Sequence, residues 1–444
     1  MKLYNFFLEN IILRLLGCIL NDPFIKELKK LRVLILNSEN ELVNIQRKKL
    51  EKVLHYSREN VDYYKYLKNT NNKDLDIKSY PIIDKKILRE KKSLLLSNIV
   101  PKSNLIKHVS SGSSGIQSEV YWTKKEQAIH RATQILWWEW AGYKIGQRIL
   151  QTGITPNRTL IKKIKDLLFR TKYVQAFAHS QTDLLNSLNW AKNKNVFFAG
   201  YASSLFVFSK FSKLNNLNIK FSDAVSWGDK LFKHYKQSIN SEFKVNVKET
   251  YASAEGLMIA AQLDLEYMYI MSPNVYIEIL DDNGNEVSDG EMGNVIVTSL
   301  NAFAMPLIRY KIGDLAIKLP KSEYPSNYKL NLPLLKRVIG RDTDIIKTVS
   351  GKYLVVHSFT GIFEHYKEII QFCVIQDNLK SIKIKIIVSK EFHENILNSI
   401  KNDLNKYTHG ELNVDFQIVN KIAATPSGKP QIIISYLSKK NTIQ

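Results

Sequence analysis

The chain has few cysteines, no long uninterrupted apolar run and no dense cluster of arginines. Only Cys18 and Cys373 occur among 444 residues, which excludes a disulfide scaffold and a cysteine-rich metal site and fits a reducing compartment. The remaining composition, 44% hydrophobic and 24% charged, is that of a globular protein large enough for two or three domains. We therefore expect a cytoplasmic protein.

The formal net charge is strongly positive, at +22. Such a charge is compatible with a nucleic acid, an anionic membrane surface or anionic small substrates, and alone it does not choose among them. The lysines are scattered, with no zinc finger and no aromatic RNA-binding motif among them. Drift in composition explains the charge best, whereas a nucleic-acid-binding protein would show a steep dependence of affinity on salt.

The first 20 residues are apolar enough to suggest a signal peptide or a membrane anchor. Glu9, Asn10 and Arg14 interrupt the run, so it falls short of the roughly 18 apolar residues that a spanning helix needs. No small-residue cleavage site follows. Two alternatives remain: a helix that packs on the body of the protein, and a peripheral helix that lies on the cytoplasmic face of a membrane.

Apolar spacing divides the rest of the chain into regions of different texture. Residues 24–70 have helical spacing. Residues 104–310 alternate short apolar runs with longer helical patterns such as 127–140, which is typical of a layered α/β domain. Within this region, residues 275–298 predict a β-hairpin around the turn 281–285.

The last hundred or so residues predict a small α+β domain. Residues 382–386 alternate apolar and basic side chains as a strand does, and residues 391–406 have the spacing of a helix. A closing strand is expected after Lys429.

A serine- and glycine-rich loop is the strongest local signal. It follows the apolar Leu105 and Ile106 and precedes the strand-like residues 120–122. Glycines let a backbone approach phosphate closely and offer N–H donors, and serine hydroxyls add more, so the loop is suited to wrap a polyphosphate. A Ser/Gly turn is by default a flexible loop, and this one is no Walker loop, because no Gly-Lys-Ser/Thr follows. The serine-glycine loop consists of Ser110, Ser111, Gly112, Ser113, Ser114 and Gly115.

Two carboxylates and one lysine stand in settings that suit nucleotide chemistry. Glu255 lies among the small residues of 251–256, and Asp314 follows a turn. Glutamate oxygens suit Mg²⁺, and an aspartate can accept both hydrogen bonds of a ribose diol. Lys429 stands on the small-residue turn 424–429, from which an ammonium group can reach a phosphate. Taken singly, such acids are usually solvated or helix-capping, and surface lysines are usually inert.

The order of these segments resembles that of the adenylate-forming ligases, over about residues 50–435. The serine-glycine loop is similar to their phosphate loop, and Lys429 is similar to their late catalytic lysine. The segments between resemble an adenine-contacting stretch, a tyrosine-to-glutamate motif that flanks adenine and holds magnesium, a ribose aspartate and a hinge. The shared order of these motifs argues against a chance match. The residues concerned are Gly228 and Asp229 in 225–229, then Tyr251, Ala252, Ser253 and Glu255, then Asp314 in 309–314, then Arg341 in 340–344.

Further segments resemble the phenylacetate–coenzyme A ligase family, in the branch tied to capsule and surface-polysaccharide synthesis. They are residues 62–65, 80–86, 200–205, 350–352, 356–357, 363–364 and 374–376.

Three positions depart from the family pattern. The proline common after the phosphate loop is absent, with Gln117 near its place, and Ala252 and Ala254 replace the usual glycine and hydroxyl residue of the magnesium motif. The lost hydroxyl removes one contact to phosphate or to the metal shell. The acids, the arginine and the lysine of the pattern all remain, so we expect an active enzyme.

The resemblance implies an α/β protein with the adenylate-forming enzyme fold. A large N-terminal adenylation domain with a β-rich subdomain is expected over residues 1–340, of which 1–70 form a helical lead-in. A small, mobile α+β domain is expected over residues 341–444, and it would swing about Arg341 and Asp342 between the two steps of the reaction.

The resemblance also implies the substrates and the role of each residue. ATP and a carboxylic or amino acid would give an acyl-adenylate and pyrophosphate, with Mg²⁺ on Glu255 and with Lys429 between the carboxylate and the α-phosphate. Asp314 and Arg341 would hold the ribose. Coenzyme A, or an amine or hydroxyl on a sugar precursor, would then accept the acyl group. The alternative is a catalytically weak nucleotide-binding protein of the same fold in an envelope-assembly complex, supported by Ala252 and Ala254.

The acyl pocket is expected near residues 200–201. Trp137, Trp138 and Phe177 are candidates to line it, although aromatic residues at such positions are more often plain core. His179 is a candidate substrate contact, although a structural histidine is the more common case.

Overall fold

The structure, a computed structural model, describes residues 2–69, 76–109, 119–153, 159–176, 180–341, 345–350, 353–363, 365–366, 368–408, 410–423 and 431–437. The serine-glycine loop and Lys429 lie outside the described residues, as do Phe177 and His179.

The chain opens with helices, as its apolar spacing predicts. They are α1 (Lys2–Phe7), the π-helical turn η1 (Leu8–Ile12), α2 (Leu13–Ile19), α3 (Phe24–Leu34) and α4 (Glu39–Asn60). At the start of α4, the Ser38 hydroxyl accepts a hydrogen bond from the Glu41 backbone while the Glu41 carboxylate accepts from the Ser38 backbone. None of the helices within the described ranges is long and apolar enough to cross a bilayer.

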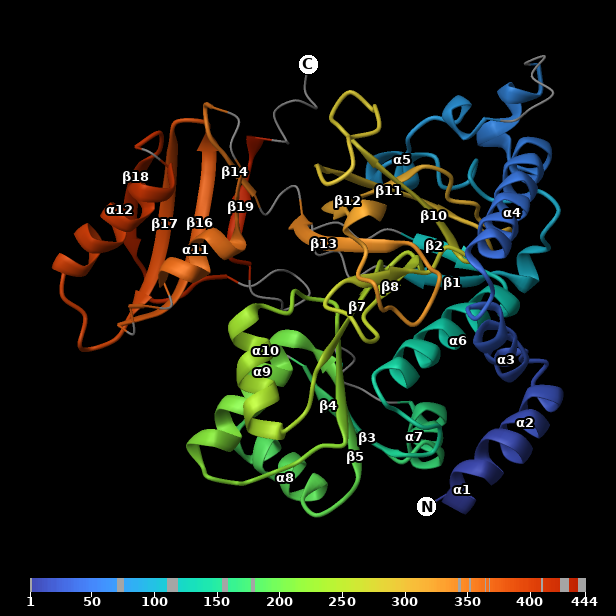
Figure 1. Cartoon of the computed structure of the whole chain (residues 1–444), viewed down its shortest axis with the longest axis horizontal. Helices are drawn as coiled ribbons and strands as arrows, with labels where there is room; N and C mark the ends of the chain where they lie inside the picture. The colour runs from blue at the N-terminus through green and yellow to red at the C-terminus, as the bar shows by residue number, and fades with distance from the viewer. Residues whose placement is uncertain are drawn as a thin grey trace.

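A sheet of eleven strands forms the centre of the molecule (Figure 1). Strands β7, β6, β5, β3 and β4 run parallel, and the other strands continue the sheet in antiparallel fashion. In sheet order the strands are β10 (Val275–Leu280), β11 (Met292–Ser299), β12 (Tyr310–Lys318), β13 (Leu334–Arg341), β9 (Met268–Ile270), β8 (Met258–Ala261), β7 (Lys248–Ala252), β6 (Asp223–Trp227), β5 (Val196–Tyr201), β3 (Arg148–Gly153) and β4 (Thr171–Gln175).

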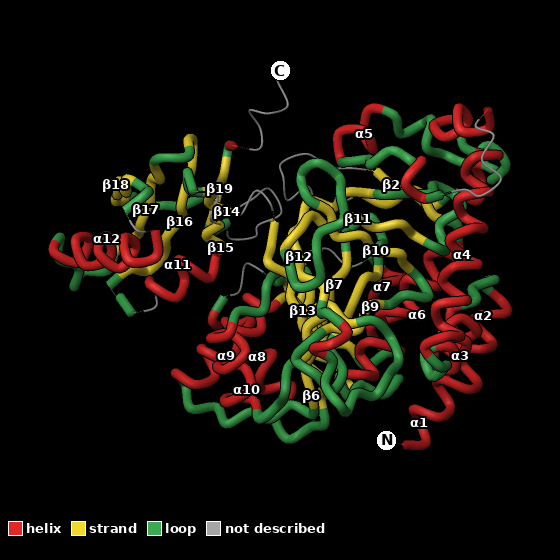
Figure 2. The backbone as a smooth tube through the Cα atoms, turned by 45° about the horizontal axis from the view of Figure 1, so that its top comes forward, coloured by secondary structure: helices red, strands yellow, loops and turns green. Residues whose placement is uncertain are grey.

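Helices cover both faces of the parallel part (Figures 1 and 2). All six residues of β5 are buried, as expected of a parallel strand that is covered on both sides. Its neighbouring residues Phe197 and Phe198 belong to different core clusters, one with α3 and α6, the other with α8 to α10. These helices are α6 (Lys124–Trp140), α7 (Leu160–Leu168), α8 (Gln181–Ala191), α9 (Ala202–Leu214) and α10 (Lys233–Phe243).

A short hairpin and a single bridge complete this part of the molecule. Strands β1 (Ile106–Val109) and β2 (Glu119–Trp122) pair antiparallel, with Val109 opposite Glu119, so the two ends of the serine-glycine loop region lie together. Residues 80–86 lie beside β12, where Ile83 exchanges backbone hydrogen bonds with Arg309 and Lys311 and is followed by α5 (Lys85–Glu90).

The C-terminal residues form a separate sheet with its own core, drawn in orange and red at one side of Figure 1. The sheet has the order β18-β17-β16-β19, and its core includes Phe359, Ile384 and Leu404. Strands β14 and β15 form a separate two-stranded sheet. The elements of this C-terminal part are β14 (Ile345–Lys347), β15 (Tyr353–Val355), α11 (Val356–Phe363), β16 (Ile369–Asn378), β17 (Ser381–Val388), α12 (Asn395–Thr408), β18 (Asn413–Ile418) and β19 (Ile433–Ser435). The predicted α/β class, with a small α+β unit at the C-terminus, is confirmed.

Candidate active site

Two tyrosine–carboxylate hydrogen bonds join the predicted magnesium motif to the predicted ribose motif. The Tyr251 hydroxyl, at the end of β7, donates to Oδ2 of Asp314 on β12 at 2.8 Å. The Tyr310 hydroxyl, also on β12, donates to Oε1 of Glu255 at 3.2 Å. Each segment therefore carries a tyrosine and, four residues later, an acid, and each tyrosine bonds the acid of the other segment. The two hydrogen bonds therefore connect the turn that carries Glu255 to the strand that carries Asp314.

The tyrosine next to Glu255 is a firm donor. Tyr310 is fully buried, and burial together with the nearby Glu255 carboxylate raises the pKa of its hydroxyl. Its hydroxyl therefore stays protonated at neutral pH, which orients one oxygen of the buried Glu255 carboxylate.

The turn that carries Glu255 is compact. Ser253 donates its backbone N–H to the Leu257 carbonyl at 2.9 Å, and Gly256 donates to the Ser253 carbonyl at 3.1 Å. Ala252 ends β7 with its side chain exposed, and the Ser253 hydroxyl is buried with no hydrogen-bond partner among the described residues. A hydroxyl so placed is available to a group that the described chain does not supply.

The end of β2, the strand that follows the serine-glycine loop in the sequence, lies next to this turn. Gly256 has φ +86°, and a Cβ there would lie 2.4 Å from the Trp122 ring and 2.7 Å from the His130 ring. Trp122 closes β2, directly after the loop region, and stacks on His108 of β1 at 3.6 Å between ring centroids. The strands that flank the loop therefore pack against the residue that follows Glu255.

Strand β13 brings the predicted hinge to the ribose aspartate. Arg341 lies opposite Asp314 in the antiparallel β12–β13 pair, and Gly340 precedes it with φ +133°. Lys230 donates to the carbonyls of Val338 at 3.3 Å and Ile339 at 2.5 Å, so the segment after the predicted adenine stretch is fastened to the same strand.

The adenine stretch itself is locked to residues 200–203. The Asp229 carboxylate accepts from the backbone N–H groups of Ala202 at 2.6 Å and Ser203 at 3.1 Å, at the start of α9, where the N-cap Tyr201 offers no side-chain cap. Gly228 has φ +79°, and a Cβ there would lie 2.4 Å from the Tyr201 ring. Asp229 therefore has a structural role as a helix cap.

The two tryptophans considered for the acyl pocket belong to the core. Trp137 and Trp138 are buried in the cluster that joins α6 to α3 and the sheet. Trp138 stacks on Trp227 with ring centroids 5.6 Å apart, so it packs against the predicted adenine stretch 225–229. Arg309, next to Tyr310, is also structural. Its guanidinium forms a buried bidentate ion pair with the Glu278 carboxylate, at 2.9 and 3.1 Å.

Two titratable residues near the site were missed in the sequence. Glu249 accepts from the Leu231 backbone at 3.3 Å, and burial raises the pKa of its carboxyl to about 7. Glu249 precedes Tyr251 by two residues on β7, and residues two apart in a strand lie on the same face of the sheet. This period was the signal that could have placed Glu249 beside Tyr251. His130, on α6, packs on Gly256, and burial lowers its pKa to about 4, with a smaller contribution from His108. A lone histidine on a helix carried no signal in the sequence.

No group of three or more His, Cys, Asp or Glu side chains arranged to hold a metal occurs in the described part of the chain. Glu255 offers one carboxylate at the compact turn, and a Mg²⁺ ion held by it would fill its remaining positions with substrate oxygens and water. This donor set fits Mg²⁺, which keeps several waters and uses one or two carboxylates with substrate phosphates.

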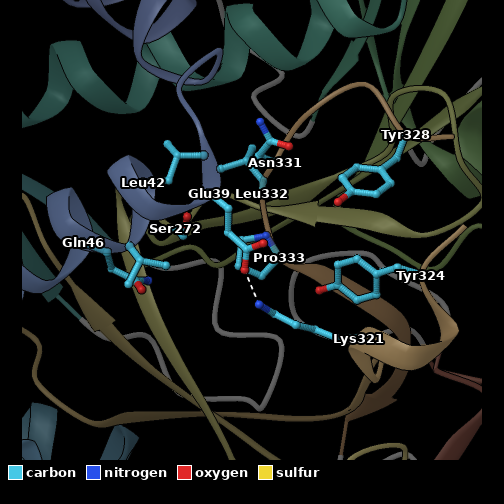
Figure 3. A pocket seen from close by; sticks show the side chains of 11 residues that line it. Glu39, Leu42, Gln46, Ser272, Lys321, Tyr324, Tyr328, Asn331, Leu332 and Pro333 are labelled. Carbon is cyan, nitrogen blue, oxygen red and sulfur yellow. Dashed lines mark hydrogen bonds and ion pairs between the residues drawn. The ribbon is translucent and has the colours of Figure 1, made fainter. Parts of the chain in front are cut away.

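A pocket elsewhere contains none of these residues (Figure 3). It lies between the start of α4 and residues 321–333, where Glu39 and Lys321 form an ion pair and Tyr324 and Tyr328 face it. It is therefore not part of the candidate active site.

Comparison with known proteins agrees with the motifs. Residues 346–436 match the family model described as the CapK C-terminal domain. Over 434 residues the chain is 25% identical to Protein CapK of Staphylococcus aureus, covering 93% of this chain and 92% of that protein. It is also 27% identical over 128 residues to phenylacetate-coenzyme A ligase of Pseudomonas putida, covering 28% of this chain and 27% of the ligase.

Solved structures show the same fold. 2-Hydroxyisobutyryl-CoA ligase in the postadenylation state, in complex with R3-HIB-AMP, matches with a TM-score of 0.70 at 16% identity, covering 92% of both chains. The same ligase in complex with 2-HIB-AMP and CoA, in the thioesterification state, matches with a TM-score of 0.56 at 16% identity over 92% of this chain and 93% of that one. The resemblance predicted from the motifs is therefore confirmed: the chain is similar to CapK over almost its whole length and to a phenylacetate-coenzyme A ligase over part of it, and it has the fold of the adenylate-forming CoA ligases.

Proposed function

We propose that this protein activates a carboxylic or amino acid with ATP as an acyl-adenylate, releases pyrophosphate, and then transfers the acyl group to an acceptor. One observation carries the proposal: Glu255 and Asp314, 59 positions apart in the sequence, are joined through Tyr310 and Tyr251 into a single acidic site. The strands that flank the serine-glycine loop pack against the same turn.

The first step would be attack by a substrate carboxylate oxygen on the α-phosphorus of ATP. A new P–O bond forms, the bond to the β-phosphate oxygen breaks, and pyrophosphate leaves with the electron pair. The protein has to position the two reactants and stabilise the charge that grows on the phosphate oxygens.

The residues have separate tasks in this proposal. Backbone N–H groups of the serine-glycine loop would hold the outgoing phosphates, and Lys429 would lie between the carboxylate and the α-phosphate. Asp314 would accept hydrogen bonds from the ribose, with Tyr251 holding its Oδ2 in place. Arg341 stands opposite Asp314 in the strand pair, a position suited to the same ribose.

Glu255 would hold Mg²⁺, which supplies positive charge to the phosphate oxygens when bound. Tyr310 fixes the orientation of this carboxylate through Oε1. The buried site around Glu255 strengthens any electrostatic interaction made there.

The second step would transfer the acyl group from the adenylate to coenzyme A, or to an amine or hydroxyl of a sugar precursor in surface-polysaccharide synthesis. The ligases of the same fold, bound to CoA, support the first acceptor. The segments that resemble the capsule and surface-polysaccharide branch support the second. Residues 341–444 would act as a swinging domain that presents a different face for each step.

ATP–pyrophosphate exchange with a broad library of carboxylic and amino acids tests the proposal. The purified full-length protein is incubated with ATP, Mg²⁺, labelled pyrophosphate and one acid at a time. We expect label to appear in ATP with one chemical class of acid and not with the others. ATP binding without exchange for any acid would reject adenylation and favour the catalytically weak nucleotide-binding protein, which Ala252 and Ala254 support.

A further inference from the structure

The N-terminal helices α1 and α2 are apolar on both of their faces. The inner face packs on the body through the buried Leu8 and Leu13, with Tyr4 and Ile12 against the same core cluster. The outer face carries large apolar side chains in contact with water, and Ile19, the most exposed, has 77% of its surface accessible. A surface helix of a globular protein is normally polar on its outer face. An exposed apolar face of this kind therefore indicates a surface that binds a protein or a membrane.

Helix α7 presents a second exposed apolar face. Ile161 and Leu167 are each 80% exposed. Leu160, just before them, and Ile164, between them, are exposed as well. The spacing i, i+1, i+4 and i+7 places all four on one side of the helix, and none of the residues of α7 is buried. The helix is held to the body by the residues at its C-terminal end, where Leu168 and Phe169 pack on the core.

The two apolar faces belong to neighbouring elements. The Tyr4 hydroxyl of α1 donates to the Leu168 carbonyl at the end of α7 at 2.7 Å. The Arg170 guanidinium lies over the Tyr4 ring, 3.7 Å from its centroid. Figure 1 shows α1, α2 and α7 along the same side of the molecule. We name the exposed apolar side chains of these three helices the outer apolar face.

Ion pairs fix the helices beneath the outer apolar face. Arg32 of α3 pairs with both Glu9 and Glu139, and Arg131 of α6 pairs with Asp22 after α2 at 2.6 Å. These ion pairs tie η1 and the residue that follows α2 to α3 and α6, and so hold the N-terminal helices on the folded protein.

Positive charges border the outer apolar face. Arg14 on α2 and Lys163 on α7 are exposed. The two acids of these helices, Glu9 and Asp166, are only partly exposed, and Glu9 is already paired with Arg32. Two copies of this chain meeting through the face would bring like charges together, whereas an anionic surface would neutralise them.

From these observations we propose that the outer apolar face docks the protein on an anionic lipid bilayer, as a peripheral protein that inserts Leu, Ile and Phe side chains between the headgroups. An apolar helical face with large aliphatic and phenylalanine side chains, bordered by lysine and arginine, is the pattern of helices that lie in the membrane interface. Basic residues near an anionic membrane add to the attraction, and this part of it weakens with salt.

Vesicle co-sedimentation of the full-length protein tests this inference. We expect binding to vesicles of phosphatidylcholine with phosphatidylglycerol, and much weaker binding to phosphatidylcholine alone. The double variant Ile161→Ser and Leu167→Ser is expected to bind the anionic vesicles at least about tenfold more weakly, because each buried aliphatic side chain contributes to insertion. Arg14→Gln with Lys163→Gln should weaken binding to the anionic vesicles and leave the weak binding to phosphatidylcholine unchanged.

A matched control uses exposed apolar residues outside the face. Leu214 on α9 and Ile370 on β16 are also highly exposed, and Leu214→Ser with Ile370→Ser is expected to bind vesicles as the unaltered protein does. Thermal unfolding of all variants and ATP–pyrophosphate exchange in solution are expected to be unchanged, which separates this inference from the proposed catalytic function.

Two results would overturn the inference. One is equal sedimentation with and without anionic vesicles. The other is a dimer by light scattering in the absence of lipid that Ile161→Ser with Leu167→Ser converts to a monomer, since the face would then bind a second copy of the chain.

Discussion

The hydroxyl of Tyr251 donates a hydrogen bond of 2.8 Å to the carboxylate of Asp314, and this bond ties the end of β7 to β12 across three intervening strands of the sheet. Its counterpart between Tyr310 and Glu255 makes the connection reciprocal. An acid held in this way keeps its free lone pairs in a fixed direction, as a ribose or a metal ion requires.

Asp314→Asn is expected to lower kcat/KM for ATP in pyrophosphate exchange by about 10- to 100-fold, because hydrogen bonds to a charged group contribute roughly 1.5–3 kcal/mol. Tyr251→Phe should have a smaller effect in the same direction, since it removes only the bond that orients Asp314. Tyr366→Phe is the matched control: its hydroxyl donates to Asp403 at 2.7 Å in the C-terminal sheet unit. Equal losses in the two tyrosine variants would contradict a role for Tyr251 at the site.

Glu255→Gln is expected to reduce exchange by about 10²–10³, the loss typical of removing one group that stabilises transition-state charge. The residue keeps its shape and its contact with Tyr310, so the fold should be retained, which circular dichroism can verify. Raising the Mg²⁺ concentration should recover part of the loss. A variant with normal exchange at every Mg²⁺ concentration would remove Glu255 from the proposed machinery.

Lys429→Ala is expected to slow adenylation by about 10²–10³ while ATP still binds. Lys421→Ala is the control, because Lys421 is an exposed lysine eight positions earlier in the same C-terminal segment. Exchange measures the first step, and isothermal titration with ATP measures binding. If both lysine variants lose the same amount of activity, the effect belongs to the general charge of the segment and not to Lys429.

Gly256→Ala should destabilise the protein well beyond the usual strain of a left-handed residue. The added Cβ would meet Trp122 at 2.4 Å and His130 at 2.7 Å. Gly290→Ala is the control, with φ +87° against +86° and its nearest neighbour, Pro320, at a comfortable 3.6 Å. We expect about 1 kcal/mol of destabilisation in the control, from backbone strain alone, and at least about 1–3 kcal/mol more in Gly256→Ala, from overpacking. Chemical denaturation of the two variants measures the difference.

His130 is expected to make stability fall on the acid side of neutrality. Its pKa is lowered to about 4 in the folded protein, against about 6.5 for an unfolded histidine. The folded state therefore binds fewer protons between these values, so the contribution of His130 is fully present above pH 6.5 and is lost as pH falls towards 4. The difference in unfolding free energy between the unaltered protein and His130→Gln should shrink over this range, by at most about 3 kcal/mol. A difference that stays constant with pH would show that His130 is not buried in its neutral form.

Periodic patterns in the sequence predicted the elements well where one face of an element is polar. The hairpin expected at 275–298 appears as β10 and β11, and the alternating residues 382–386 lie within β17. The helix expected at 391–406 begins later, at Asn395, because the polar residues before it form a turn in which Ile396 donates to the His393 carbonyl. Periodicity does not locate such a start, since capping geometry decides it.

The partners of the site residues were beyond the reach of the sequence. The motifs indicated Tyr251, Glu255 and Asp314, but no spacing rule says that Tyr310 bonds Glu255, because that contact depends on how the sheet curves. In the same way, the carboxylate of Asp229 looked like a nucleotide contact, and its engagement by the start of α9 became visible only once β5 and β6 were placed side by side. Long-range contacts of this kind arise from tertiary packing and leave no local pattern.

The pairing of Arg341 with Asp314 fixes where the C-terminal residues are attached relative to the candidate active site. The polypeptide leaves the large sheet from the strand position facing the acid itself, and only residues 342–344 separate it from the first strand of the next unit. If the C-terminal unit swings as proposed, a connection of three residues would keep the following hundred residues at a local concentration on the order of millimolar near Asp314, without any binding energy of their own. A longer connection would lower the local concentration of the C-terminal residues near Asp314.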